Sequence, residues 1–158
     1  MIDDFFERHE LSIWIFVTGI SVIMLPIFGG GLICPLVIGL LQQLLGKFTA
    51  EEFGVLLVSL ELIMSLFIAI PNILIIRGRS GAVKINKIII NIQLTCYIVV
   101  AILLEHEYKW FFIMFVFFPL LASWLMSTAR YQAFVAYHEA LHKDPVGFRQ
   151  RLLDRMHQ

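Results

Sequence analysis

Four long stretches of this sequence carry almost no charge, and they constrain the fold more than any other feature. Residues 11–46, 88–104 and 110–129 contain no Asp, Glu, Lys or Arg, and residues 53–76 contain only Glu61. About 20 consecutive apolar residues can cross the hydrocarbon core of a bilayer as a helix. A water-soluble protein of 158 residues could not bury this much apolar surface, because 59% of the residues are hydrophobic. The sequence therefore predicts an all-α integral membrane protein, a bundle of four transmembrane helices.

The charged residues divide this single membrane domain into segments. We expect an N-terminal segment at residues 1–11, spans at 12–45, 53–76 and 88–104, a fourth span at 110–142 that extends out of the membrane, and a basic amphipathic helix at 145–157. The N-terminal segment is acidic, the opposite of the basic region that opens a secretory signal, so we expect the first span to be retained. Thr49 to Glu52 has the capping-box pattern that starts a helix, and Asp144 precedes Pro145 as an N-cap would.

The basic residues predict the orientation of the spans. Ten of the twelve Lys and Arg residues fall on the side that holds residues 77–87 and both termini, and only Lys47 and Lys109 fall on the other side. Cytoplasmic loops carry an excess of basic residues, so both termini are predicted to be cytoplasmic, in a membrane of the bacterial inner-membrane type. The formal net charge is zero, which gives no field that would attract nucleic acid.

The first charge-free run is too long for one straight span and is predicted to break in the middle. Prolines remove helical hydrogen bonds, and glycines adopt non-helical dihedral angles readily. Both interpretations of the break remain open: an unwound stretch that lines a functional site, or a bend at the outer interface. The residues of the predicted break are Pro26, Gly29, Gly30, Gly31 and Pro35.

Several polar residues fall inside the predicted spans. Asn72, Asn91, Gln93 and Thr95 are predicted to form hydrogen bonds between the second and third spans. Glu61 is the one carboxylate within a span, and an ionisable residue inside a membrane is a candidate functional residue. Two roles are open for Glu61: it takes part in proton or ion movement, or it pairs with Lys47 or Lys109 near the outer surface.

The C-terminal part carries two surfaces suited to contacts outside the bilayer core. Alanines recur at spacings of four and three, which allows close approach of another helix, either in this chain or in a second copy; these are Ala129, Ala133, Ala136 and Ala140. The amphipathic helix carries arginines that suit the anionic lipids of the inner leaflet; these are Arg149, Arg151 and Arg155.

One short motif suggests catalysis. Residues 138–142 read His-Glu-Ala-Leu-His and resemble the zinc-metalloprotease signature. The resemblance implies that His138 and His142 bind zinc and that Glu139 acts as the general base. Lys143 and Asp144 stand where those families have an uncharged and an apolar residue, so the alternative is that the motif residues form a solvated helix face.

The sequence supports three functional hypotheses. The first is a membrane interaction protein without catalytic activity or cofactor, such as an immunity or exclusion factor or an accessory subunit. The chain is similar in size and topology to small four-helix membrane families that include pore-toxin immunity proteins, a likeness at the level of the fold only. The second is a homo-oligomeric channel or transporter subunit, and the third is a membrane metalloprotease.

Overall fold

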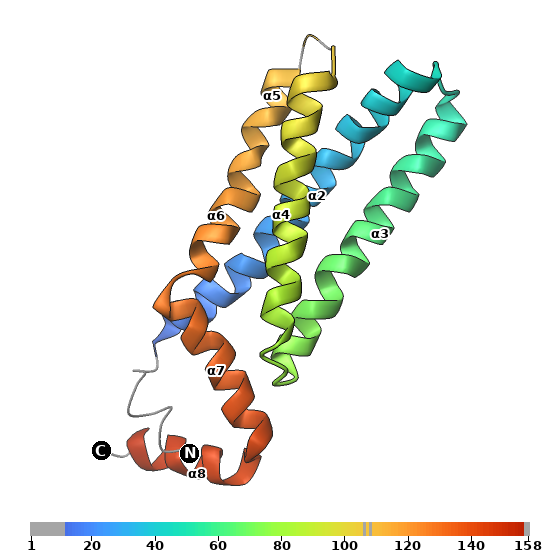
Figure 1. Ribbon diagram of the computed structural model, residues 1–158. Helices are drawn as coiled ribbons and strands as arrows, with labels where there is room; N and C mark the ends of the chain where they lie inside the picture. The colour runs from blue at the N-terminus through green and yellow to red at the C-terminus, as the bar shows by residue number, and fades with distance from the viewer. Residues whose placement is uncertain (1–11, 106, 108, 157–158) are drawn as a thin grey trace.

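The computed structural model describes residues 12–105, 107 and 109–156, and those residues form helices without any strand. The elements are α2 (Ile13–Leu45), α3 (Ala50–Ile76), α4 (Ala82–Leu103), α5 (Lys109–Ile113), the 3-10 helix η1 (Met114–Val116), α6 (Phe117–Met126), α7 (Ala129–Lys143) and α8 (Pro145–Met156) (Figure 1). The predicted N-terminal segment at residues 1–11 lies outside the described residues.

Four helical stretches are long and apolar enough to cross a membrane, which confirms the predicted all-helical membrane protein. They are α2, α3, α4 and the run from Lys109 to Met126 that α5, η1 and α6 form together. Helix α2 crosses the bundle obliquely and contacts α3, α4, α6 and α7 (Figure 1). As drawn there, the end that holds residues 46–49 is called the upper end and the end that holds residues 78–81 the lower end.

Side-chain caps fix where two helices begin, as the sequence predicted. At the start of α3, Thr49 Oγ1 accepts the Glu52 N–H at 3.2 Å, and the Glu52 carboxylate accepts the Thr49 N–H at 2.8 Å. At the start of α8, the Asp144 carboxylate accepts the Gly147 N–H at 3.0 Å. These bonds satisfy donors that the first turn of a helix leaves without intrahelical partners.

Helix α2 is continuous over 33 residues, so the predicted unwound stretch at Pro26, Gly29, Gly30, Gly31 and Pro35 is wrong, whereas the alternative, a bend in the helix, stays a prediction. Both prolines lie inside the helix, where each removes one backbone donor. Side chains of α4 reach this part of α2. Gln93 Nε2 donates to the carbonyl of Pro26 at 2.8 Å, and the Tyr97 hydroxyl donates to that of Gly29 at 2.9 Å. Packing and buried hydrogen bonds therefore hold the proline-containing helix in the bundle.

Glycines on α2 provide room for neighbouring helices. A Cβ added at Gly29 would lie 2.9 Å from Cδ of Pro119 in α6, and one added at Gly19 would overlap the ring of Phe134 in α7. Both distances are shorter than ordinary contacts between carbon atoms, which lie near 3.5–4.0 Å. The glycine-rich sequence of α2 thus serves close helix packing, which explains why it did not mark a break.

The fourth span does not continue through residue 142 as one helix, which corrects the prediction. Helix α6 ends at Met126, and α7 begins at Ala129 after a turn (Figure 1). In that turn the hydroxyls of Ser127 and Thr128 donate to the carbonyls of residues 124 and 125, each at 2.6 Å. Thr128 Oγ1 also accepts the Tyr131 N–H at 3.4 Å as an N-cap. Side chains that bond locally to the backbone compete with helix continuation, which accounts for the interruption.

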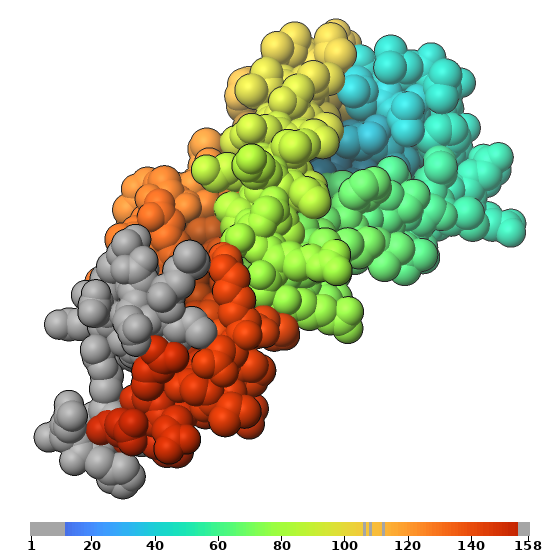
Figure 2. All heavy atoms as spheres, turned by 60° about the horizontal axis from the view of Figure 1, so that its bottom comes forward, coloured from blue at the N-terminus to red at the C-terminus, as the bar shows by residue number. Residues whose placement is uncertain are grey.

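Helices α7 and α8 lie at the lower end of the bundle, beside the ends of the spans (Figures 1 and 2). Of the predicted alanine stripe, Ala133 is buried in the core cluster that includes residues of α2 and α6, while Ala136 and Ala140 pack against Phe148 of α8. Ala129 is exposed. Three of the four alanines therefore contact helices of this chain.

Candidate interaction surface

The predicted polar link between the second and third spans exists, but with a partner that the sequence analysis missed. Asn72 of α3 donates to the carbonyl of Ile68 at 2.7 Å and accepts from Nδ2 of Asn86 in α4 at 2.7 Å. Both asparagines are buried. Asn86 fell within the segment interpreted as a loop, although it lies seven residues before Gln93 and therefore on the same helical face.

The other predicted polar residues of α4 divide between two faces. Gln93 is fully buried and bonds to α2 instead of α3. Asn91 and Thr95 are exposed, and Thr95 Oγ1 donates to the Asn91 carbonyl at 2.9 Å within the same helix. A separation of two residues rotates a side chain by more than half a turn of a helix, so these residues cannot share the face of Gln93.

The two asparagines are expected to stabilise the pairing of α3 with α4. In a double-mutant cycle with Asn72→Leu and Asn86→Leu, we expect a coupling energy of about 0.6–2 kcal/mol, the range for polar pairs between membrane helices. The free energy of unfolding, measured by detergent titration in mixed micelles, gives this value. Asn91→Leu is the control and should change stability by less than about 0.5 kcal/mol. Additive effects of the two substitutions would contradict the pairing.

The protease-like motif lies on α7, outside the spans. The Nδ1 atoms of His138 and His142 lie 2.9 and 3.2 Å from the carbonyl oxygens one turn earlier. Lys143 Nζ donates to the Glu139 carboxylate at 2.7 Å, and this bond, with one from Ser80, lowers the pKa of that carboxyl. Among the described residues, no three His, Cys, Asp or Glu side chains gather closely enough to hold a metal ion. The described part of the chain therefore supplies no third ligand.

Helix α8 packs on α7 through Phe148 and Leu152. Its exposed side carries Val146 and Leu153, with Arg149 exposed between them. Arg151 turns back to its own helix, where its Nε donates to the carbonyl of residue 147 at 3.2 Å. The side chain of Arg155 lies outside the described part. The predicted contact of Arg149, Arg151 and Arg155 with lipid stays a prediction.

Glu61 lies on α3 well inside the apolar stretch and is exposed. In the described part of the chain it makes no ion pair, and the predicted partners lie elsewhere. Lys47 follows the upper end of α2, and Lys109 donates to the Ala101 carbonyl at 3.4 Å and lies over the Trp110 ring. The carboxylate therefore faces the surroundings of the bundle.

Glu61 belongs to a row on α3 in which Val58, Glu61 and Ser65 are exposed and Gly54 and Ala69 are half-buried among the described residues. The row follows a spacing of four, three, four and four residues, which keeps it on one helical face; we call it the open stripe, and it consists of Gly54, Val58, Glu61, Ser65 and Ala69. Val58 is 67% exposed, and a Cβ added at Gly54 would meet no atom within 4 Å. By contrast, three glycines of α2, at positions 19, 29 and 30, are in close contact with other helices.

The open stripe continues a face that is packed further down. Ile68 and Asn72, which follow Glu61 by about two and three turns, are buried against the rest of the bundle. Above them α3 and α4 diverge (Figure 1). Only 6% of the most apolar stretch of α3 is buried, compared with 44% of that of α2. Helix α3 is thus the least buried of the four spans.

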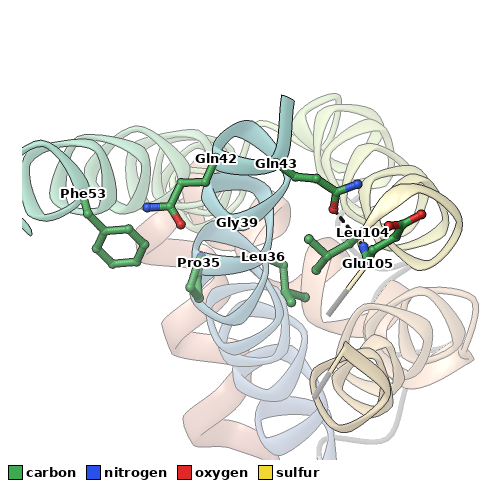
Figure 3. A pocket seen from close by; sticks show the side chains of 8 residues that line it. All are labelled: Pro35, Leu36, Gly39, Gln42, Gln43, Phe53, Leu104 and Glu105. Atoms are coloured by element: carbon green, nitrogen blue, oxygen red, sulfur yellow. Dashed lines mark hydrogen bonds between the residues drawn. The ribbon is translucent and has the colours of Figure 1, made fainter. Parts of the chain in front are cut away.

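A separate pocket of about 380 Å³ lies at the upper end and shares no residue with the open stripe (Figure 3). Gln43 binds the end of α4 beside it, because its Nε2 donates to the Leu103 carbonyl at 3.1 Å and its Oε1 accepts the Glu105 N–H at 2.8 Å. Gln42 points to the other side, toward Phe53. The lining residues are Pro35, Leu36, Gly39, Gln42, Gln43, Phe53, Leu104 and Glu105.

Comparison with known proteins identifies no relative of this chain. No protein-family model, no curated protein and no solved structure matches the chain.

Proposed function

We propose that this protein is a membrane interaction protein that receives a transmembrane helix of another protein on the open stripe of α3. The observation that supports the proposal is a helix face that carries the small residues Gly54, Ser65 and Ala69 and a carboxylate, and on which the described residues leave Val58, Glu61 and Ser65 exposed. Small residues on a membrane helix allow a second backbone to approach closely, and van der Waals packing then drives association. Lipid tails covering the same face would leave Glu61 unsatisfied.

The proposal includes the finer expectations from the sequence. The protein resides in a membrane of the bacterial inner-membrane type with both termini in the cytoplasm, as the ten-to-two distribution of basic residues favours. Its partner is a protein that assembles in or enters that membrane, so an immunity factor, an exclusion factor or an accessory subunit would all use this surface. The proposal requires no cofactor and no catalytic group.

Site-specific photo-crosslinking in membranes tests the proposal. A photoreactive residue replaces Val58 on the open stripe, and in a control variant it replaces Ile98 of α4, which is 59% exposed. We expect one defined protein adduct from position 58 and only lipid adducts from position 98. Adding Gly54→Leu, which fills the stripe, should abolish the adduct. Equal labelling at both positions, or an adduct unchanged by Gly54→Leu, would refute the docking surface.

A homo-oligomeric channel is the second candidate, and the same carboxylate favours it. Four helices leave no pore of their own, so several copies would have to place Glu61 along a shared path. In proteoliposomes of the purified protein, Glu61→Gln should then change ion flux at least severalfold. Flux equal to that of protein-free liposomes would exclude this function and leave the interaction protein.

A further inference from the structure

The depth of Glu61 in the bilayer determines which partner groups can reach it. The carboxylate follows the start of α3 by 11 residues and precedes its end by 15, in a helix of 27 residues. At 1.5 Å per residue these separations are about 17 and 23 Å, and the hydrocarbon core is about 30 Å thick. Because α3 is about 10 Å longer than the core, Glu61 lies about 7–17 Å below the upper boundary of the core, depending on the register of the helix in the bilayer.

A second copy of the chain cannot supply a cation to Glu61. All twelve Lys and Arg residues lie outside the charge-free stretches of the spans. The basic residues near the upper end are Lys47, which precedes the start of α3, and Lys109, which begins α5, whereas Glu61 lies about three turns into α3. Two copies packed through the open stripe with parallel α3 helices would also bring two Glu61 carboxylates together, and like charges oppose that arrangement.

We infer that the helix received by the open stripe belongs to a different protein and carries a Lys or Arg residue that pairs with Glu61 within the hydrocarbon core. This inference rests on the proposed function and specifies its partner. A charge inside a membrane is costly unless an opposite charge or a hydrogen-bond partner meets it. The small residues Gly54 and Ser65, one on each side of Glu61, leave space for the long stem of a basic side chain.

Synthetic transmembrane helices test the inference with the full-length protein in nanodiscs. The probe is a leucine–alanine helix with one Lys about 17 Å from its upper end. Three further peptides carry Leu there, carry Glu there, or carry the Lys seven residues nearer the lower end. Affinity is read from energy transfer between dye-labelled protein and dye-labelled peptide. The wild-type protein should bind the matched Lys peptide roughly three- to twentyfold more tightly than the Leu peptide, the range for one polar contact between membrane helices.

Charge reversal identifies the pair. Glu61→Leu should abolish the preference for Lys while binding of the Leu peptide is retained, which also shows that the variant is folded. Glu61→Lys should bind the Glu peptide in preference to the Lys peptide. Equal affinity for matched, shifted and Leu peptides would overturn the inference, and so would a homodimer that Gly54→Leu dissociates. Peptide binding without charge preference, together with the adduct at position 58, would leave the docking function intact and only this inference refuted.

Discussion

A Gly19→Ala variant is expected to be less stable than the wild-type protein, although alanine favours a helix more than glycine does. The added Cβ would overlap the ring of Phe134. That ring cannot move aside easily, because it is 5% exposed and His138 lies 4.4 Å away, centroid to centroid. Overpacking of this kind costs typically 1–3 kcal/mol, which exceeds the gain in helix propensity of up to about 1 kcal/mol. Detergent titration of the unfolding equilibrium measures the loss.

Gly31→Ala is the matched control in the same helix. A Cβ at Gly31 meets no atom within 4 Å, so only the helix propensity changes. This variant should be as stable as the wild type or up to about 1 kcal/mol more stable. Gly19→Ala should thus lower the unfolding midpoint, and Gly31→Ala should leave it unchanged or raise it. If both shift it in the same direction, the close contact between α2 and α7 at Gly19 does not exist.

The number and placement of the spans could be read from the sequence because charge is excluded from the bilayer. Because charged side chains avoid the hydrocarbon core, high hydropathy and the absence of Asp, Glu, Lys and Arg mark the residues that cross the bilayer. Boundaries were less accurate where a helix includes charged residues, as α4 does by starting at Ala82, before Lys84 and Lys87. The residues of that first turn were therefore interpreted as a loop, and Asn86 was missed with them.

Two local predictions failed because the same residues serve two purposes. Proline and glycine predicted a break in α2, but glycine also removes the Cβ that would keep another helix away, and only the packing of α6 and α7 distinguishes the two roles. The fourth span was predicted to continue as one helix through residue 142. The hydroxyls of Ser127 and Thr128 bond to the backbone nearby and interrupt the helix. The regular spacing of the alanines gave no indication of this interruption.

The candidate site was partly visible in the sequence. Glu61 could be recognised in the sequence because it is the single charged residue in a span. The other residues of the open stripe could not be recognised in this way. Gly54 and Ser65 are ordinary residues for a membrane helix, and other glycines, such as Gly19 and Gly29 of α2, are covered by neighbouring helices. Only the three-dimensional arrangement shows which small-residue face lacks a neighbour, since this depends on where α4 diverges from α3.

Phe148→Ala is expected to release α8 from α7. Phe148 is 1% exposed and is surrounded by the apolar side chains of Ala136, Tyr137, Ala140, Leu141 and Leu152. Replacing a buried phenylalanine by alanine costs about 3–5 kcal/mol. A helix of 12 residues is marginal in water without such packing, so α8 should open locally while the spans stay folded. Amide hydrogen exchange in α8 should then become at least about a hundredfold faster.

Val146→Ala is the control that separates the loss of buried packing from the effect of shortening any apolar side chain in α8. Val146 belongs to the same helix and is 75% exposed, so its truncation should leave exchange in α8 within about twofold of the wild type. Exchange in α2 and α4 should be unchanged in both variants, because the main contacts of α8 among the described residues are with α7. Uniformly faster exchange along the whole chain in Phe148→Ala would mean that α8 and the bundle unfold as one unit. Protection of α8 as in the wild type would mean that contacts other than those of Phe148 hold α8 in place.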